Sequence, residues 1–358
     1  MKTIETRYLP GRLGTPNMAM KDDPRADPRM LAALTPFGFD VPPAPASVDK
    51  DSPIDAVLAF TAEAEAGYAE VFKTFFASLP PLQGVTSRTE VIEGVDKNDI
   101  KLYIHRPTSL GSSAPCIVHT HGGGMVIGQA ADTSYIRWRD ELAAIGMVVV
   151  GVEFRNGGGA LGPHPFPAGL NDCASAVSWV DQHRKELGIS KIVVSGESGG
   201  GNLALATALK ANKEGWIKRI AGIYAQCPYI SNAYGNPPPS LPSLFENDGY
   251  FLNVAMMGAL AKAYDPNGLN AKNPLAWPYY ATSADLDGLP PHVISVNQLD
   301  PLRDEGLAYF SKLLNAGVSA VSRTVNGTCH AGDCLLPAAM PDVYRATLRD
   351  IAGFANSL

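Results

Sequence analysis

Ser198 stands at the centre of a Gly196-Glu197-Ser198-Gly199-Gly200 run, a G-x-S-x-G pattern that could present a nucleophilic serine. Residues 192–195 suit a buried parallel strand, and small and apolar residues typical of a helix follow the pattern. A serine on such a strand-to-helix turn has its hydroxyl exposed, and glycines at its flanks avoid collision with the adjoining backbone. The pattern alone also fits a plain glycine-rich turn, so its position between a strand and a helix is what favours a nucleophile.

A serine hydroxyl needs a base to take its proton, and a carboxylate on the far side of that base fixes the tautomer. Of the seven histidines, His330 alone lies in a loop after the last predicted strand, 320–325, and downstream of a suitable acid. The acid is Asp300, which ends the predicted strand 291–300. Asp304 and Glu305 are alternatives, but both open the next predicted helix, where acids commonly cap amides. The order serine, acid, histidine is typical of an α/β-hydrolase.

Two further features of the chain bear on this chemistry. Gly122, Gly123 and Gly124 follow a short buried strand, 116–120, where backbone amides could face a ligand unobstructed. His121, directly before them, is interpreted as a structural residue of this loop. We expect the loop to supply donors to an oxyanion.

The alternation of predicted strands and helices along the chain predicts a mostly parallel, doubly wound sheet with catalytic groups at the carboxyl ends of its strands. We expect an N-terminal arm and cap helix over residues 1–85, core over 86–227 and 276–358, and a cap insertion over 228–275. The helix expected over 54–79, with Ser52 as its cap, carries an apolar and aromatic stripe: Tyr68, Val71, Phe72, Phe75, Phe76 and Leu79. This stripe is either ordinary core or the underside of a lid.

The bulk composition excludes several classes of function. The 358 residues carry a net charge of −6, which gives no support for nucleic-acid binding. No apolar run is long enough to span a membrane, and the first residues lack an apolar signal core, so we expect a cytoplasmic protein. The five cysteines have no metal-ligand spacing; we therefore predict buried thiols, no metal and no cofactor.

Three motifs together resemble the hormone-sensitive-lipase-like bacterial carboxylesterases: His121-Gly-Gly-Gly124, Gly196-Glu-Ser-Gly-Gly200 and Asp300-Pro-Leu-Arg-Asp-Glu305. The resemblance runs from about residue 86 to the C-terminus. It implies an α/β-hydrolase fold, a two-part cap, and the amides of Gly123, Gly124 and Gly199 as oxyanion donors. Two segments depart from the sequence pattern of many family members: Phe154-Arg-Asn-Gly-Gly-Gly-Ala-Leu-Gly and His330-Ala-Gly. Both lie near the expected pocket, so the substrate preference can differ from that of the family.

The sequence therefore predicts a serine carboxylesterase acting through Ser198, His330 and Asp300 on a small-molecule ester. We expect Met125, Tyr250 and Phe251 to contact substrate, as parts of an apolar roof that favours short-chain or lactone-like esters. An amidase or a lipase with the same triad, or a non-catalytic ligand-binding protein on the same scaffold, are the alternatives. A homodimer is also compatible with the sequence.

Overall fold

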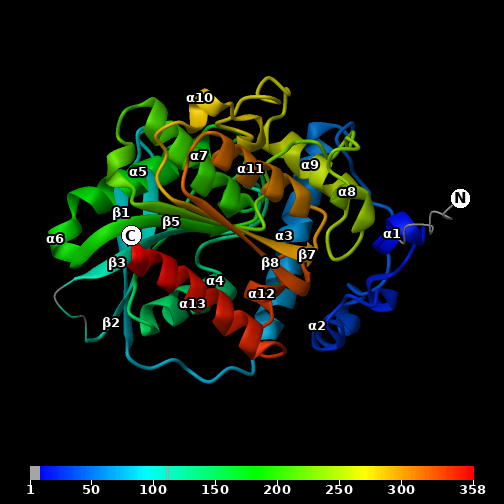
Figure 1. Cartoon of the computed structure of the whole chain (residues 1–358), viewed down its shortest axis with the longest axis horizontal. Helices are drawn as coiled ribbons and strands as arrows, with labels where there is room; N and C mark the ends of the chain where they lie inside the picture. The colour runs from blue at the N-terminus through cyan, green and yellow to red at the C-terminus, as the bar shows by residue number, and fades with distance from the viewer. Residues whose placement is uncertain (1–8, 110, 112) are drawn as a thin grey trace, which may run out of the picture.

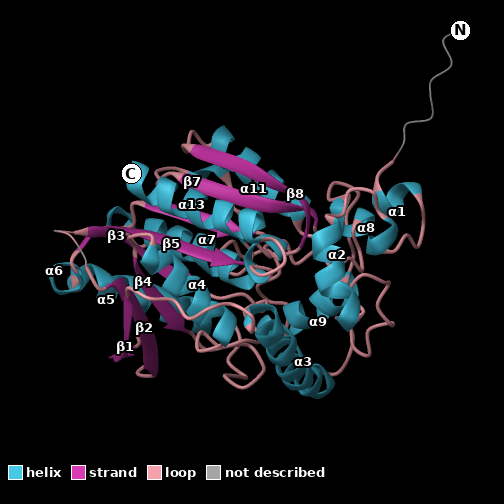
Figure 2. Ribbon diagram, turned by 90° about the horizontal axis from the view of Figure 1, so that it is seen from below, coloured by secondary structure: helices cyan, strands magenta, loops and turns pink. Residues whose placement is uncertain are grey.

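The computed structural model describes residues 9–109, 111 and 113–358, and it is built around one eight-stranded sheet (Figures 1 and 2). The strand order is β1-β2-β4-β3-β5-β6-β7-β8. β1 pairs antiparallel with β2 and β2 with β4, whereas every other neighbouring pair is parallel. The strands are β1 Val85–Glu93, β2 Asp99–Pro107, β3 Ala114–Thr120, β4 Val148–Glu153, β5 Ile189–Glu197, β6 Gly222–Gln226, β7 His292–Leu299 and β8 Ala320–Cys329.

Helices cover both faces of the sheet. α5, α7 and α11 lie on one face, and α4 and α13 lie on the other (Figure 1). The helices are α1 Gly11–Gly14, α2 Pro28–Leu34, α3 Ile54–Phe76, α4 Thr133–Ala144, α5 Ala168–Gln182, α6 Arg184–Leu187, α7 Gly199–Lys213, α8 Ser243–Glu246, α9 Val254–Tyr264, α10 Ser283–Leu286, α11 Arg303–Asn315, α12 Gly332–Leu335 and α13 Pro341–Ser357. The predicted mostly parallel α/β fold is confirmed.

The central strands are apolar on both faces because each face is covered. Every residue of β3 is buried. Successive side chains of a strand point to opposite faces, so Val118 and Val194 belong to the core under α5 and α7. Their neighbours Ile117 and Val193 belong to the second core, under α4 and α13. Continuous apolar runs therefore place β3 and β5, which lead into the glycine loop and the serine turn, in the middle of the sheet.

The segments outside the alternating pattern gather at one end of the sheet, on the right of Figure 1, where α3 packs against α9 and α1 against α8. The arm that precedes α3 packs against the rest of the protein. Met30 is fully buried, Arg25 pairs with Glu246, and the amide of Asp27 donates to the carbonyl of Gly327 at 2.9 Å. The arm is thus held both to the insertion between β6 and β7 and to the end of β8.

Three details differ from expectation. α3 begins at Ile54 after Pro53, and the Ser52 hydroxyl donates to Asp49 at 3.0 Å instead of capping the helix. α4 lies in a stretch for which no element was predicted, and short helices interrupt the arm.

As predicted, all five cysteines are buried and unpaired as free thiols.

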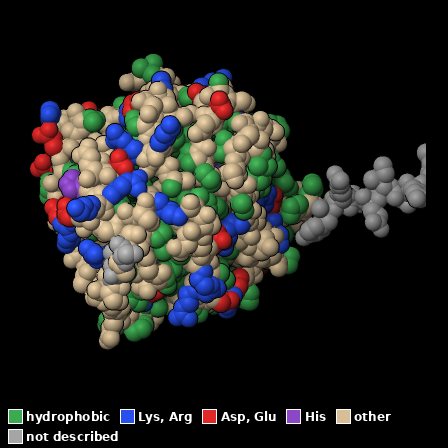
Figure 3. All heavy atoms as spheres, turned by 60° about the vertical axis from the view of Figure 1, so that its left-hand side comes forward, with side chains coloured by type: hydrophobic (Ala, Val, Ile, Leu, Met, Phe, Trp, Pro, Cys, Tyr) green, Lys and Arg blue, Asp and Glu red, His purple; other side chains and the backbone are tan. Residues whose placement is uncertain are grey.

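The surface carries mixed charge. On the face shown in Figure 3, Lys and Arg side chains are interspersed with acidic and hydrophobic ones. Such a mixture accords with the net charge of −6 and differs from the basic stripe that a nucleic acid requires. Within the described residues, no helix has the length and apolar character needed to cross a membrane.

Candidate active site

Ser198 occupies a sharp turn between β5 and α7, with φ 56° and ψ −118°. Its amide donates to the carbonyl of Gln226 at 2.9 Å, which ties the turn to the end of β6. The end of β3 crowds the turn from the other side. A Cβ on Gly196 would lie 2.3 Å from Thr120 Oγ1, and one on Gly200 would lie 1.9 Å from the Thr120 carbonyl oxygen. The two glycines are therefore required by close approach of backbone, as the sequence predicted.

His330 and Asp300 are hydrogen-bonded partners. His330 Nδ1 lies 2.8 Å from Asp300 Oδ2, and both side chains are buried. The other carboxylate oxygen of Asp300 accepts from the Leu302 amide at 2.8 Å, which fixes the orientation of the carboxylate. A carboxylate only accepts, so Nδ1 of His330 carries the proton and Nε2 is left able to accept one. Ser198 and His330 line the same cavity.

The neighbouring acids have other partners. Asp304 accepts from the Ser243 amide at 2.7 Å and from Arg303 Nε at 2.9 Å. It therefore joins the first turn of α11 to α8. Glu305 accepts from the Ile230 amide at 2.6 Å and lies fully buried. Of the three carboxylates in this run, Asp300 is the one that contacts His330.

The glycine loop between β3 and α4 presents amides beside the serine turn. Gly123 has φ 106° and Gly124 has φ 64°, and a Cβ on Gly123 would lie 1.9 Å from the Ile127 carbonyl oxygen. A Cβ on Gly199 would lie 2.6 Å from the Gly124 amide nitrogen, so loop and turn are in direct contact. Among the described residues, no hydrogen bond uses the amides of Gly123 or Gly124. The amide of Gly199 opens α7, where helix amides lack intrahelical partners.

His121 and Glu197 hold this loop from behind. His121 Nδ1 lies 2.7 Å from the Gly122 carbonyl oxygen, and its ring stacks on Phe154 at 4.2 Å. Burial lowers the pKa of His121 to about 4, so the ring is neutral and serves as a structural support, as predicted. Glu197 Oε1 accepts from the Gly122 amide at 2.8 Å. Sequence reasoning missed Glu197, because the x positions of G-x-S-x-G carry no stated requirement.

The cavity above Ser198 has a volume of about 310 Å³ and is roofed by α3 and α9. Phe251 lines it, together with the glycine loop. The apolar and aromatic lining comes from α3 (Phe60, Tyr68, Phe72), from the insertion (Leu252, Met256, Met257, Leu260) and from α4 and α12 (Tyr135, Trp138, Leu335). Tyr68 and Phe72 of the aromatic stripe therefore face the cavity, whereas Phe75 and Phe76 belong to the core under α4.

Two of the expected substrate contacts lie outside this lining. Met125 is 1% exposed at φ 60°, and its carbonyl oxygen accepts from the Gly157 amide. Tyr250 is also 1% exposed, and its hydroxyl donates to Asp23 at 3.1 Å. Both residues are buried and neither is part of the cavity lining. Phe251 is the one of the three with a surface on the cavity.

One compact group of metal-ligating side chains is present among the described residues: Cys227, Asp300 and His330. Ser198 itself is not part of it. A serine turn, a buried histidine–carboxylate pair and a loop of available amides together are the groups that acyl transfer requires.

Comparison with known proteins agrees with this geometry. Residues 117–332 match the family described as alpha/beta hydrolase fold. The solved structure of brefeldin A esterase, a bacterial homologue of human hormone-sensitive lipase, is 44% identical with a TM-score of 0.92, covering 97% of this chain and 98% of that one. Esterase Est22 is 38% identical with a TM-score of 0.86, covering 95% and 99%. Carboxylesterase NlhH of Mycobacterium tuberculosis is 32% identical over 286 residues, 78% of this chain and 84% of that protein.

The chain belongs to the α/β-hydrolase family, in its hormone-sensitive-lipase-like group of esterases. Within that class it is a carboxylesterase, as its relatives are.

Proposed function

We propose that the protein hydrolyses carboxylic esters through an acyl-enzyme formed on Ser198. His330 takes the proton of the serine hydroxyl and later returns it to the leaving alcohol, while Asp300 orients the imidazole. The single observation that carries this proposal is the 2.8 Å contact between His330 Nδ1 and Asp300 Oδ2, beside a cavity that Ser198 shares. Ser198 and His330 make no hydrogen bond to each other within the described residues, and in substrate-free sites such contacts commonly tighten when substrate binds.

The oxyanion of the tetrahedral intermediate is proposed to bind the amides of Gly123, Gly124 and Gly199. Their support is the direct contact between the glycine loop and the serine turn, and the absence of competing partners for the two loop amides in the described chain. Removing one donor of this kind costs about 2.7–4 kcal/mol of transition-state stabilisation. The glycine loop should thus matter nearly as much as the named side chains.

The substrates are proposed to be small esters with a short acyl chain, or lactone-like esters. The cavity volume of about 310 Å³ is at the lower end of small-molecule sites, which favours compact substrates over triglycerides. The similar brefeldin A esterase is named for a lactone, and a structure of esterase Est22 holds p-nitrophenol. Amides and long-chain esters are the alternatives that the same chemistry allows.

The roof is proposed to be a two-part cap, formed by residues 1–85 and the insertion 228–275 over a core of 86–227 and 276–358. Its support is the packing of α3 against α9 and the pairing of Arg25 with Glu246. A cap of two separate segments can limit the cavity without covering the sheet edge completely. It would exclude water from the acyl-enzyme and set the length of chain that fits.

The function is tested with Ser198→Ala and a matched control, Ser195→Ala. Ser195 lies three residues earlier on β5 with a buried hydroxyl that has no partner, so its loss should leave the site unchanged. Hydrolysis of p-nitrophenyl acetate and labelling by a fluorophosphonate probe should disappear in Ser198→Ala and persist in Ser195→Ala. Retained hydrolysis by Ser198→Ala would overturn the proposal, as would activity that a chelator removes and added metal restores.

A further inference from the structure

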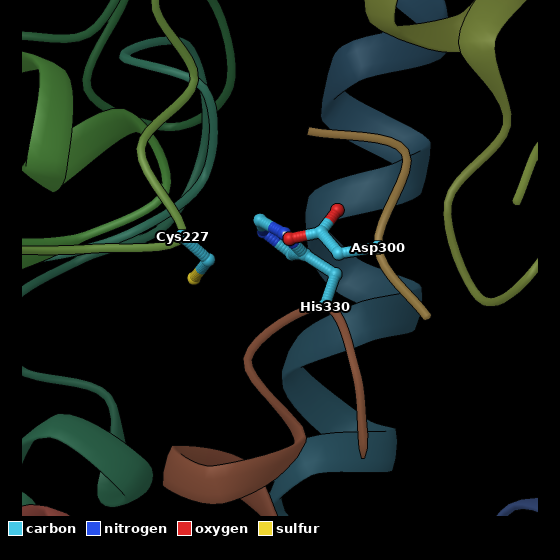
Figure 4. A group of neighbouring side chains, drawn as sticks. All are labelled: Cys227, Asp300 and His330. Carbon is cyan, nitrogen blue, oxygen red and sulfur yellow. The ribbon is translucent and has the colours of Figure 1, made fainter. Parts of the chain in front are cut away.

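Cys227, Asp300 and His330 meet at the carboxyl edge of the sheet, each as the first residue after its strand. Cys227 follows β6, Asp300 follows β7 and His330 follows β8. One thiol sulfur, one carboxylate oxygen and one imidazole nitrogen all lie within 4.8 Å of one another, and all three side chains are buried. Figure 4 shows the three neighbouring side chains, each on a separate segment of the chain.

The backbone holds two of these side chains firmly. Cys227 has φ 34°, a conformation that costs free energy for a residue with a Cβ, and its amide donates to the Ser295 carbonyl at 2.7 Å. The backbone carbonyl of Asp300 accepts from Asn247 Nδ2 at 3.1 Å. The positive φ of Cys227 therefore costs free energy, and this backbone conformation places the thiol next to the histidine–carboxylate pair.

We propose that Cys227, Asp300 and His330 form an inhibitory binding site for a borderline or soft divalent cation, with Zn²⁺ and Cd²⁺ as its best ligands. Thiolate and imidazole select such ions over Mg²⁺ and Ca²⁺, which prefer oxygen. Charge balance supports the proposal. The two negative charges of one thiolate and one carboxylate, beside a neutral imidazole, offset the two positive charges of the ion, so the occupied site buries no net charge.

The required geometry is close to the one present. Tetrahedral zinc with bond lengths of about 2.0–2.3 Å separates its ligand atoms by about 3.3–3.7 Å. The separations of up to 4.8 Å must shorten by about 1 Å, and the 2.8 Å contact between His330 Nδ1 and Asp300 Oδ2 must open if both of these atoms bind the ion. His330 lines the cavity, whereas Cys227 and Asp300 are buried outside its lining, so we propose that the ion reaches them past the His330 ring and takes a water as its fourth ligand.

Occupancy removes the base. A neutral imidazole offers one nitrogen lone pair, and a metal bound to either ring nitrogen uses that lone pair, so His330 can no longer accept the serine proton. This inhibitory consequence rests on the proposed function, whereas binding of the ion does not. The balance of the binding step is simple: the thiol gives its proton to solvent and its sulfur lone pair to the metal.

The inhibition test measures p-nitrophenyl acetate hydrolysis during titration with Zn²⁺ and with Cd²⁺. We expect inhibition that EDTA reverses. Cys227→Ser should raise the half-inhibitory concentration by at least about tenfold, because it removes the thiolate ligand. The control is Cys173→Ser, since Cys173 is a buried free thiol of α5 outside both the cluster and the cavity lining. Equal inhibition of wild type and Cys227→Ser would overturn the proposal, and so would loss of inhibition in Cys173→Ser alone.

A second measurement separates this proposal from the proposed function. Co²⁺ is added to inactive Ser198→Ala, which keeps all three ligands, and the thiolate-to-cobalt charge-transfer absorption is recorded. The band should be present in Ser198→Ala and absent when Cys227→Ser or Cys227→Ala is added to it. Absence of the band from Ser198→Ala overturns the metal site. A band there without inhibition of the wild type supports the metal site and instead contradicts His330 as the base.

Discussion

A hydrogen bond of 2.8 Å joins the Gly122 amide to Glu197 Oε1, and so couples the glycine loop to the serine turn. Glu197 precedes Ser198 and Gly122 precedes Gly123. The second carboxylate oxygen of Glu197 lies 3.0 Å from His119 Nε2. Burial opposes ionisation of Glu197, but the charge and hydrogen bond of His119 and the Gly122 amide together lower its pKa. A buried carboxylate thus fixes the distance between the proposed nucleophile and its proposed oxyanion donors.

Glu197→Gln should lower kcat with little change in KM. The amide keeps the shape of the side chain but weakens the hydrogen bond to Gly122, so the loop amides move relative to Ser198. A displacement of about 1 Å in a catalytic group can cost about a hundredfold in rate, and we expect a loss of roughly ten- to a hundredfold. Steady-state kinetics with p-nitrophenyl acetate gives both constants. Glu63→Gln, a change on the exposed face of α3, is the control, and an unchanged kcat in Glu197→Gln would contradict the coupling.

Sequence periodicity could predict the centre of the sheet because the central strands are buried on both faces. The residues around Val118 and Val194 form continuous apolar runs, a pattern that is characteristic of strands buried on both faces. α4 was missed because it mixes polar and aromatic residues, and its burial of Trp138 and Arg139 comes from tertiary packing. The helices of the arm were missed for a related reason: they are short, and packing against the rest of the protein stabilises them more than their own sequence does.

The candidate triad could be predicted because its chemistry restricts both residue type and chain order. The direction in which a side chain points, toward the cavity or away from it, could not be predicted in the same way. Tyr250 and Phe251 are neighbours, yet Tyr250 points to Asp23 and Phe251 to the cavity. Cys227 could not be found either, since its closeness to His330 depends on the order of strands β6, β7 and β8 in the sheet.

Asp300→Asn should lower kcat by orders of magnitude with the fold intact. Asparagine can donate to Nδ1 of His330 and so stabilise the wrong tautomer, and in a well-studied triad this change costs about ten-thousandfold. Asp304→Asn is the matched control, because Asp304 contacts Ser243 and Arg303 and not His330. It should cost about 1 kcal/mol of stability or less and leave kcat near wild type. A reversal of the two effects would assign the acid to Asp304.

Glu65→Gln should loosen the attachment of α3 over the cavity. Glu65 is a buried carboxylate of α3 that accepts from the Gly128 amide at 2.7 Å and from the Ala160 amide at 2.6 Å. An amide nitrogen in place of one oxygen leaves one of these donors unsatisfied, at a cost of about 1–3 kcal/mol. We expect a lower free energy of unfolding in urea and a higher KM, with kcat less affected. Glu63→Gln on the exposed face of α3 should change none of these quantities.

Glu305→Gln should flatten the dependence of stability on pH. Burial raises the pKa of Glu305 to about 8, from the ordinary value near 4.5, so the folded protein holds a proton that the unfolded chain releases. Stability therefore falls as pH rises from about 4.5 to about 8, since over that window the unfolded state binds fewer protons. Glutamine imitates the protonated acid and keeps an acceptor for the Ile230 amide. We would measure the free energy of unfolding in urea at several pH values. The free energy of the variant should rise relative to that of wild type as pH rises, and an unchanged difference would contradict the prediction.

Acyl-chain preference tests the roof directly. A cavity of about 310 Å³ enclosed by α3 and α9 should give higher kcat/KM on p-nitrophenyl acetate to hexanoate than on palmitate, without activation at an oil–water interface. Phe72→Ala should move the optimum toward longer chains, because Phe72 lines the cavity and its removal adds space there. Phe76→Ala is the control: it removes a ring of the same helix that packs in the core under α4 and is not part of the cavity lining, so it should lower stability without moving the optimum. A wild-type optimum at laurate or longer would mean that the roof opens widely in solution, and the enzyme would then be a lipase.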